Sequence, residues 1–160
     1  MKRVLTVIVI LLVIFRLEAK DISKLDKFII TSIETYIDNE KEFVKRGISV
    51  DDTCCFFVCT DGLPADFPSD SVQNVVFFSL NNISGLPSPF KLKLKKGIDA
   101  LFIGLEISNS QIIITVSGRR VRRLKNNIIS IAISDWGIFT YEYSCEKQKW
   151  EFLEPKFGGV

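Results

Sequence analysis

The chain has 160 residues, of which 47% are hydrophobic and 25% are charged, with 21 Lys and Arg residues against 19 Asp and Glu residues. This length suits one domain, and the apolar content excludes disordered, collagen-like and low-complexity proteins. The sequence contains no histidine. It therefore lacks the commonest general base and every metal site that requires imidazole.

Residues 1–19 are typical of a secretory signal peptide. Lys2 and Arg3 precede an apolar run over residues 4–15, and Ala19 offers a small residue at the expected cleavage point. The run is too short for a transmembrane helix, which needs about 20 apolar residues; an uncleaved anchor is the alternative. We predict an exported protein, secreted or periplasmic, with residues 20–160 as a single domain and no stable membrane insertion after cleavage.

The charges of residues 20–160 balance at 18 basic and 18 acidic groups but are unevenly distributed. Residues 20–90 carry 6 basic and 11 acidic groups, whereas residues 91–125 carry 9 and 2. A polarised surface of this kind can orient a charged partner. Nucleic acid is not expected as that partner, because the domain is neutral overall and has no aromatic stacking motif beside its arginines.

Residues 21–46 are predicted to form one long amphipathic helix. Ser23 and Asp26 resemble a capping box at its start, and Gly47 can close it in the left-handed conformation. Apolar residues recur at spacings of three and four, as expected for one buried helical stripe: Ile22, Leu25, Ile29, Ile33, Tyr36, Ile37 and Val44.

After Gly47 the apolar pattern changes to alternation and solid runs, which predicts strands. The predicted strands are residues 53–60, 74–80, 90–95, 100–108, 111–117, 128–134, 138–145 and 150–153. Because the links between them are short, we expect antiparallel pairing. The predicted fold class is α+β: a long N-terminal amphipathic helix packed on a curved antiparallel meander sheet of about six to eight strands. This order of elements is similar in architecture, and in architecture alone, to cystatin-like and NTF2-like rolls.

Several predicted strands are apolar on both sides, notably residues 75–78, 101–103 and 112–114. Such strands need cover on both faces, and one helix covers only one. The second face must therefore curl on itself, face a second layer, enclose an apolar cavity or form a dimer. Residues 90–95 instead alternate apolar side chains with lysines, which favours a solvated edge strand.

Four cysteines are present: Cys54, Cys55 and Cys59 within one predicted strand, and Cys145 at the end of another. Disulfides are the default in an exported protein. Cysteines along one strand are too far apart to join, so we predict that Cys145 is a partner, with Cys59 as first choice. The alternative is that the cysteines are small buried thiols. Neither a zinc site nor a thiol nucleophile is expected.

Two groups of residues are candidate binding sites. The first is a basic cluster suited to phosphate, an anionic glycan or an acidic protein face: Arg119, Arg120, Arg122, Arg123 and Lys125. Its alternative is a solvated hairpin loop, and with the lysines of residues 91–96 it would form one positive face. The second group, Tyr141, Tyr143 and Trp150, predicts either cross-strand packing or an exposed aromatic surface.

No catalytic constellation stands out, because the carboxylates fall in turns and no nucleophile elbow or phosphate-binding loop occurs. We expect no catalytic residue, metal or cofactor. The sequence favours an exported non-catalytic binding protein of the inhibitor or immunity type, acting on another protein through an apolar sheet face and polarised charge. The alternative is a binder of a small apolar ligand, or an NTF2-like enzyme, with an internal cavity.

Overall fold

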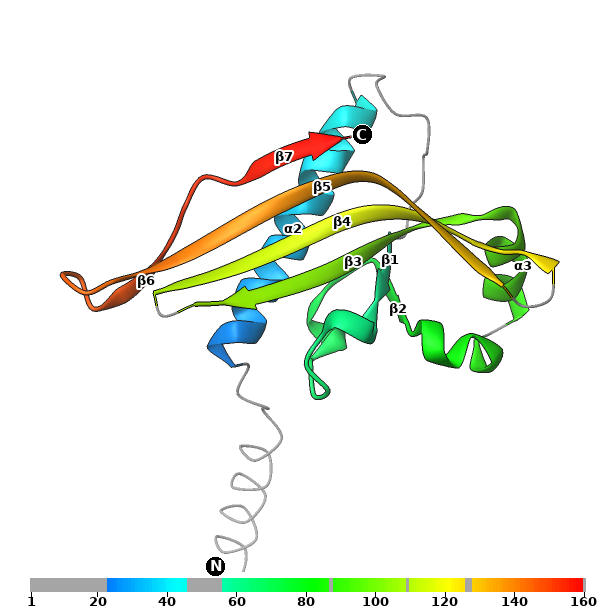
Figure 1. Cartoon of the computed structure of the whole chain (residues 1–160), viewed down its shortest axis with the longest axis horizontal. Helices are drawn as coiled ribbons and strands as arrows, with labels where there is room; N and C mark the ends of the chain where they lie inside the picture. Colours follow the sequence, from blue (N-terminus) through cyan, green and yellow to red (C-terminus); the bar gives the residue numbers. More distant parts are fainter. Residues whose placement is uncertain (1–22, 46–55, 87, 109, 126–127, 160) are drawn as a thin grey trace, which may run out of the picture.

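The computed structural model describes residues 23–45, 56–86, 88–108, 110–125 and 128–159 (Figure 1). The predicted signal peptide and the first two cysteines lie outside these ranges. The described residues form a long helix, a shorter helix and a curled sheet of seven strands. The predicted α+β class, with a long helix packed on a curved sheet, is confirmed.

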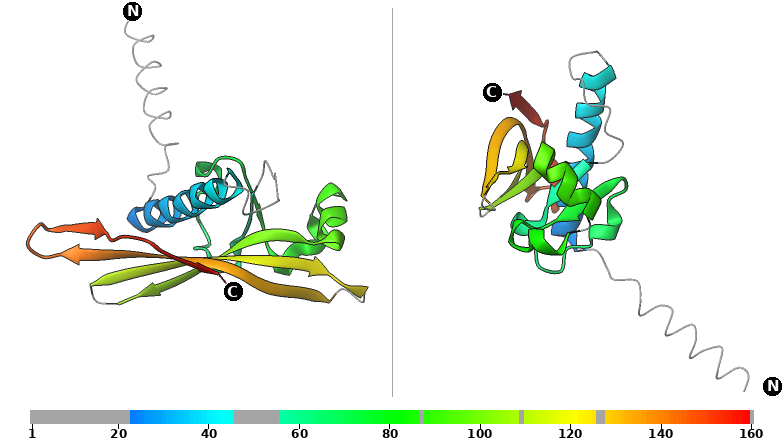
Figure 2. Two further views of the ribbon diagram at one scale, coloured as in Figure 1. Left: turned by 90° about the horizontal axis from the view of Figure 1, so that it is seen from above. Right: turned by 90° about the vertical axis from the view of Figure 1, so that its right-hand side faces the viewer.

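The long helix, α2 (Lys24–Lys45), starts where its capping box predicts. The Asp26 N–H donates to Ser23 Oγ at 3.0 Å, and the Ser23 hydroxyl donates to Asp26 Oδ2 at 2.7 Å. Of the predicted apolar stripe, Ile29 and Ile33 are fully inaccessible to solvent, Tyr36 and Ile37 are buried and Leu25 is partly buried; Ile22 and the Val44 side chain lie outside the described part. Figure 2 shows α2 lying across one side of the long strands.

The strands are β1 (Phe56–Cys59), β2 (Val75–Phe78), β3 (Ile98–Ile107), β4 (Gln111–Arg123), β5 (Ile129–Ser144), β6 (Lys149–Phe152) and β7 (Lys156–Gly159). Their order across the sheet is β2–β1–β3–β4–β5–β6, and β7 also pairs with β5. The sheet is mixed rather than wholly antiparallel, because β1 runs parallel to both β2 and β3. The predicted meander is wrong here: residues 60–74, which contain two short 3₁₀ helices, are long enough for a parallel crossover.

The long strands β4 and β5 also differ from the prediction. Residues 135–137 were expected to form a turn between two strands, but they lie within β5. A register shift beside Gly118 and Arg119 absorbs the irregularity as a bulge instead of ending the strand. β4 in turn continues to Arg123, so its arginines lie on a strand and not in a hairpin loop.

The predicted edge strand at residues 90–95 is wrong, because this segment is the helix α3 (Ser88–Lys96). Phe90 and Leu94 lie one turn apart and are buried together against the sheet. Three ordinary helix signals explain the outcome. Pro89 stands in the first turn, lysines fill the last turn, and Gly97 (φ 101°) ends the helix with its N–H bonded to the Lys93 carbonyl at 2.9 Å.

Two apolar clusters occupy opposite sides of the sheet, since they take alternate residues of β3. Leu101 and Ile103 belong to the cluster under α2, which also contains residues of β4 and β5. Ile98 and Ala100 belong to the cluster under α3. The second helix therefore provides part of the second layer that the doubly apolar strands require.

Candidate binding surface

The cations of α3 and of the second half of β4 gather at one end of the molecule. Arg122 Nε donates to the Lys95 carbonyl oxygen at 3.3 Å, and a Cβ at Gly97 would lie 2.8 Å from Arg120 Nε. These contacts join two basic segments whose adjacency the sequence alone did not decide. We call this set of residues the basic end: Lys91, Lys93, Lys95, Lys96, Arg120, Arg122, Arg123 and Lys125.

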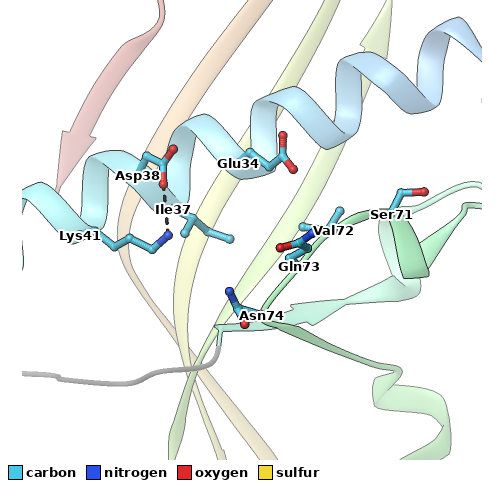
Figure 3. A pocket seen from close by; sticks show the side chains of 8 residues that line it. All are labelled: Glu34, Ile37, Asp38, Lys41, Ser71, Val72, Gln73 and Asn74. Atoms are coloured by element: carbon cyan, nitrogen blue, oxygen red, sulfur yellow. Dashed lines mark hydrogen bonds and ion pairs between the residues drawn. The ribbon is translucent and has the colours of Figure 1, made fainter.

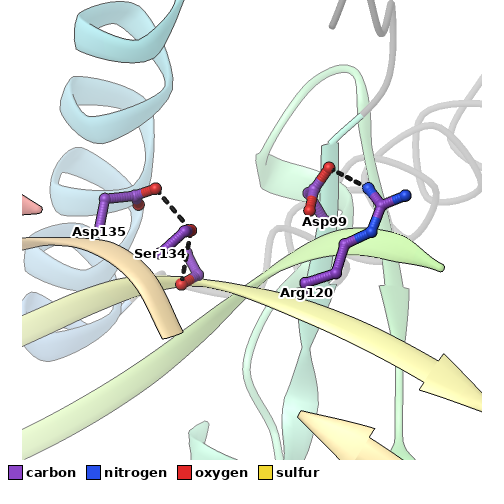
Figure 4. Close-up of polar contacts among 5 residues, drawn as sticks. Asp99, Arg120, Ser134 and Asp135 are labelled. Carbon is purple, nitrogen blue, oxygen red and sulfur yellow. Dashed lines mark hydrogen bonds and ion pairs between the residues drawn. The ribbon is translucent and has the colours of Figure 1, made fainter. Parts of the chain in front are cut away.

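The basic end keeps an excess of positive charge. Asp99 is the one acid in residues 88–102 and 119–133, and it forms an ion pair with Arg120 at 2.5 Å across β3 and β4 (Figure 4). Both side chains of this pair are about half exposed, so the pair adds little to stability. The other cations create a local field suited to an acidic partner.

Large apolar side chains are exposed on the same segments of the chain and on the neighbouring strand β5. Leu92 lies on the outer side of α3, and the others lie at the tip of the β4–β5 hairpin and along β5: Leu124, Ile128, Ile131 and Ile133. Ile131 and Ile133 face Val121 and Arg119 in the antiparallel register. Exposed apolar residues next to arginines are typical of protein-binding surfaces.

Arg119 differs from its neighbours in the basic cluster, because it lies over a ring. Its guanidinium carbon is 4.6 Å from the centroid of Phe102, and its Nε donates to Ser117 Oγ at 3.1 Å. Ile133, its partner across the strands, is 54% exposed. The cation–π contact holds the Arg119 guanidinium group in one orientation, while the neighbouring Ile133 side chain stays exposed to solvent.

The three predicted aromatic residues do not share this surface. Tyr141 is only 4% exposed: its hydroxyl donates to the Phe28 carbonyl oxygen at 3.1 Å and lies 3.2 Å from Ser32 Oγ. Burial raises the pKa of Tyr141 above its ordinary value. Its prediction as a surface contact is therefore wrong, because its ring packs under α2.

Tyr143 and Trp150 form an edge-to-face pair with centroids 5.5 Å apart. Tyr143 lies fourteen positions along β5 from Ile129, the partner of Arg123. That separation is about 46 Å of extended chain. The structure thus places the aromatic pair and the basic end at different ends of the sheet, and they do not form one site.

The predicted disulfide between Cys59 and Cys145 is not formed, since both are free thiols, one buried and one exposed. The strand register explains why. Cys59 pairs with Phe102 of β3, Phe102 pairs with Ser117 of β4, and Ser117 pairs with Trp136 of β5. Cys145 lies nine positions further along the chain, about 30 Å of extended strand. Burial raises the pKa of the Cys59 thiol, which fits a core residue.

The sequence offered no signal for Asp135, a half-buried acid at the bulge of β5. Its Oδ2 accepts a hydrogen bond from Ser134 Oγ at 2.6 Å (Figure 4), while its Oδ1 is buried without a hydrogen-bond partner. A Cβ at Gly118 would lie 2.2 Å from this Oδ1 and 2.9 Å from the Tyr36 hydroxyl, so no larger residue fits there. Burial raises the pKa of Asp135 above its ordinary value.

Asp135→Asn is expected to stabilise the protein at pH 7 by about 1 kcal/mol. The pKa of Asp135 is higher in the folded than in the unfolded protein, so the folded state favours the protonated acid. The protonated acid stabilises the folded state at low pH, and this stabilisation is lost as the pH rises through the folded pKa. The difference in free energy of unfolding between Asp135→Asn and the wild-type protein should therefore be smaller at pH 3 than at pH 7. Urea denaturation at both pH values measures this difference. Asp38→Asn, which removes only an exposed ion pair with Lys41, is the control and should change the free energy of unfolding at pH 7 by less than about 0.5 kcal/mol.

A hollow of about 310 Å³ lies between α2 and residues 71–74 (Figure 3). Its walls are mostly polar, including Glu34 and the Asp38–Lys41 ion pair at 3.2 Å. The space between α2 and the sheet is filled, since Ile33, Tyr36 and Phe139 are almost completely buried there. This hollow is therefore not the apolar cavity, lined by inner strand faces, that the small-ligand alternative requires.

In the part of the chain that the structure describes, no group of three or more Cys, Asp or Glu residues is arranged to hold a metal ion. Within the same ranges, no helix has both the length and the apolar character needed to cross a membrane. Comparison with known proteins finds no matching family model, no similar curated protein and no similar solved structure.

Proposed function

We propose that this protein is an exported, non-catalytic binding protein of the inhibitor or immunity type, and that its basic end contacts an acidic face of another protein. The observation that carries this proposal is the gathering of eight cations, four from α3, three from β4 and Lys125 just after β4, around a single acid, in segments that also expose leucines and isoleucines. Positive charge steers an acidic partner towards the surface, and the apolar side chains supply area to bury.

The composition of this surface favours a protein over the other polyanions. Leu92, Ile128 and Ile133 are among the most exposed large apolar residues of the described chain. They would stay in water against a phosphate backbone, whose contacts are mainly polar and charged. Against a protein they would be desolvated, as at the apolar centre of an interface. Balanced overall charge in residues 20–160 also disfavours a general polyanion binder.

The test compares two double charge reversals that change the net charge equally. Lys95→Glu with Arg122→Glu alters the basic end, and Lys149→Glu with Lys156→Glu alters exposed lysines on β6 and β7. Partners are captured by cross-linking the exported protein in its native extracellular fraction, and their affinities are then measured with purified components. The basic-end variant should bind at least tenfold more weakly, mainly through a slower association rate.

The control variant should keep the affinity of the wild-type protein within about twofold. A partner that binds both variants equally would place the interface elsewhere. Binding to vesicles of anionic lipid, with no protein captured, would contradict a protein partner and indicate a membrane surface instead.

A further inference from the structure

Within the described ranges, the outer edge of β5 is unpaired over Ile129–Ser134. β7 pairs with β5 only at residues 135–138, and β6 pairs only at residues 141–144. Among the described residues, no strand pairs with the remaining segment on the side away from β4. Residues 130–134 are all exposed.

The direction of the backbone groups along this edge follows from one hydrogen bond. The Leu124 N–H donates to the Ile128 carbonyl oxygen at 2.7 Å, which makes these two a hydrogen-bonded pair. In antiparallel strands such pairs alternate with pairs that do not bond each other. The backbone N–H and C=O groups of Ile129, Ile131 and Ile133 therefore point away from β4, towards the open edge.

Apart from the bulge of β5 at its far end, this edge lacks the usual protection against strand addition. Residues 128–134 contain no charged residue and no proline, although lysines and prolines are what natural edges commonly use. The outer edge of β3 is different. There Gly62 lies against the Ile103 carbonyl so closely that a Cβ would come within 2.1 Å of the oxygen.

We propose that the open edge of β5 accepts an extended acidic segment of the partner protein as an added β-strand. This inference rests on the proposed function and names how the partner is held. Main-chain hydrogen bonds to Ile129, Ile131 and Ile133 supply the pairing, as in other complexes formed by strand addition. The cations of β4 lie on the adjacent strand, so acidic side chains of the added strand are attracted to them.

Charge also favours an acidic segment over a second copy of this chain as the strand that pairs with the β5 edge. A second copy of this chain would pair β5 with β5 and bring two sets of β4 cations towards each other. Like charges repel at that range, so a homodimer through this edge is disfavoured. An acidic segment would instead be attracted to the β4 cations.

The first test is amide hydrogen exchange of the full exported protein, followed by NMR. The probe is a seven-residue peptide of alternating Glu and Val, and its counterpart with Lys in place of Glu is the control. The acidic peptide should slow exchange of the Ile129, Ile131 and Ile133 amides at least tenfold. Ser130 and Ala132, which already bond to β4, should change little, and the basic peptide should protect none of these amides.

The second test separates the backbone from the side chain at one position. Ile131→Pro removes an outward N–H, whereas Ile131→Ala removes only side-chain contact; proline is tolerated where an edge N–H faces solvent. The proline variant should bind the acidic peptide at least tenfold more weakly than the alanine variant. If the proline variant does not fold, the exchange experiment still decides the question.

The outcomes separate the two proposals. If the captured partner depends on Lys95 and Arg122 but leaves the Ile129, Ile131 and Ile133 amides unprotected, the basic end binds and strand addition is wrong. If these amides become protected by either peptide alike, the acidic specificity is wrong. Protection that rises with protein concentration in the absence of peptide would indicate a second copy and overturn the inference.

Discussion

Leu94→Ala is expected to lower the free energy of unfolding by about 3 kcal/mol, whereas Leu92→Ala should change it by less than about 0.5 kcal/mol. Both residues lie in α3, two positions apart, but Leu94 is fully buried and Leu92 is 62% exposed. Leu94 belongs with Phe90 to the cluster against the sheet, so truncating it leaves a cavity. Urea denaturation followed by circular dichroism measures both values.

This pair of variants also distinguishes a helix from an edge strand. In a strand, Phe90, Leu92 and Leu94 would share one face, so the two leucines would respond alike. In a helix, Phe90 and Leu94 share a face and Leu92 points away from it. Equal losses of stability for Leu92→Ala and Leu94→Ala would therefore contradict α3.

Gly62→Ala is expected to destabilise the protein by about 2–3 kcal/mol. The cause is a steric clash, because the added Cβ would lie 2.1 Å from the backbone oxygen of Ile103 and backbone cannot move aside cheaply. Relief would require the short 3₁₀ helix that follows β1 (Thr60–Gly62) to lift from β3. Thermal and urea unfolding of the purified variant measure the loss.

Gly104→Ala is the matched control, since it makes the same chemical change on the neighbouring part of β3. Its Cβ would lie 3.6 Å from Thr115 Cβ, an ordinary contact. Because glycine weakens strand interiors, this variant should be unchanged or more stable by about 0.5 kcal/mol. A stable Gly62→Ala variant would show that the 3₁₀ helix is not seated against β3.

Both variants bear on the proposed binding surface. α3 carries half of the cations of the basic end, so its placement decides whether those lysines meet the arginines of β4. The contact at Gly62 covers part of the β3 edge, which leaves β5 as the edge with the longer free stretch among the described residues. The proposed binding surface thus depends on the packing of α3 and on the contact at Gly62, although Leu94 and Gly62 would not touch a partner.

The long helix and the fold class could be predicted from local sequence patterns. The three- and four-residue spacing from Leu25 to Ile37 appears as the buried stripe of α2, and the Ser23–Asp26 capping box marks the observed start. These features are local, because a helix satisfies its hydrogen bonds within its own segment and shows its period directly. The strand at residues 149–152 was found within one residue of its bounds for a similar reason.

Residues 90–95 show where local pattern was insufficient. Their alternation of Phe, Leu and Lys fits a strand period, yet it also places Phe90 and Leu94 one helical turn apart. The flanking Pro89 and Gly97 indicated a helix, and packing against Ile98, Ala100 and Val121 selected it. An apolar pattern this short is compatible with both periods until a surface is available to bury it.

The spatial neighbours of each strand could not be predicted from the sequence. Strand pairing joins residues far apart in the sequence, so spacing alone could not show that β1 is parallel to β3 or that Cys145 is remote from Cys59. The same non-local pairing removed Tyr141 from the surface and brought Lys95 to Arg122. The sequence shows that cations and apolar strands are present; their gathering into one basic end beside an open edge follows from the register of β3, β4 and β5.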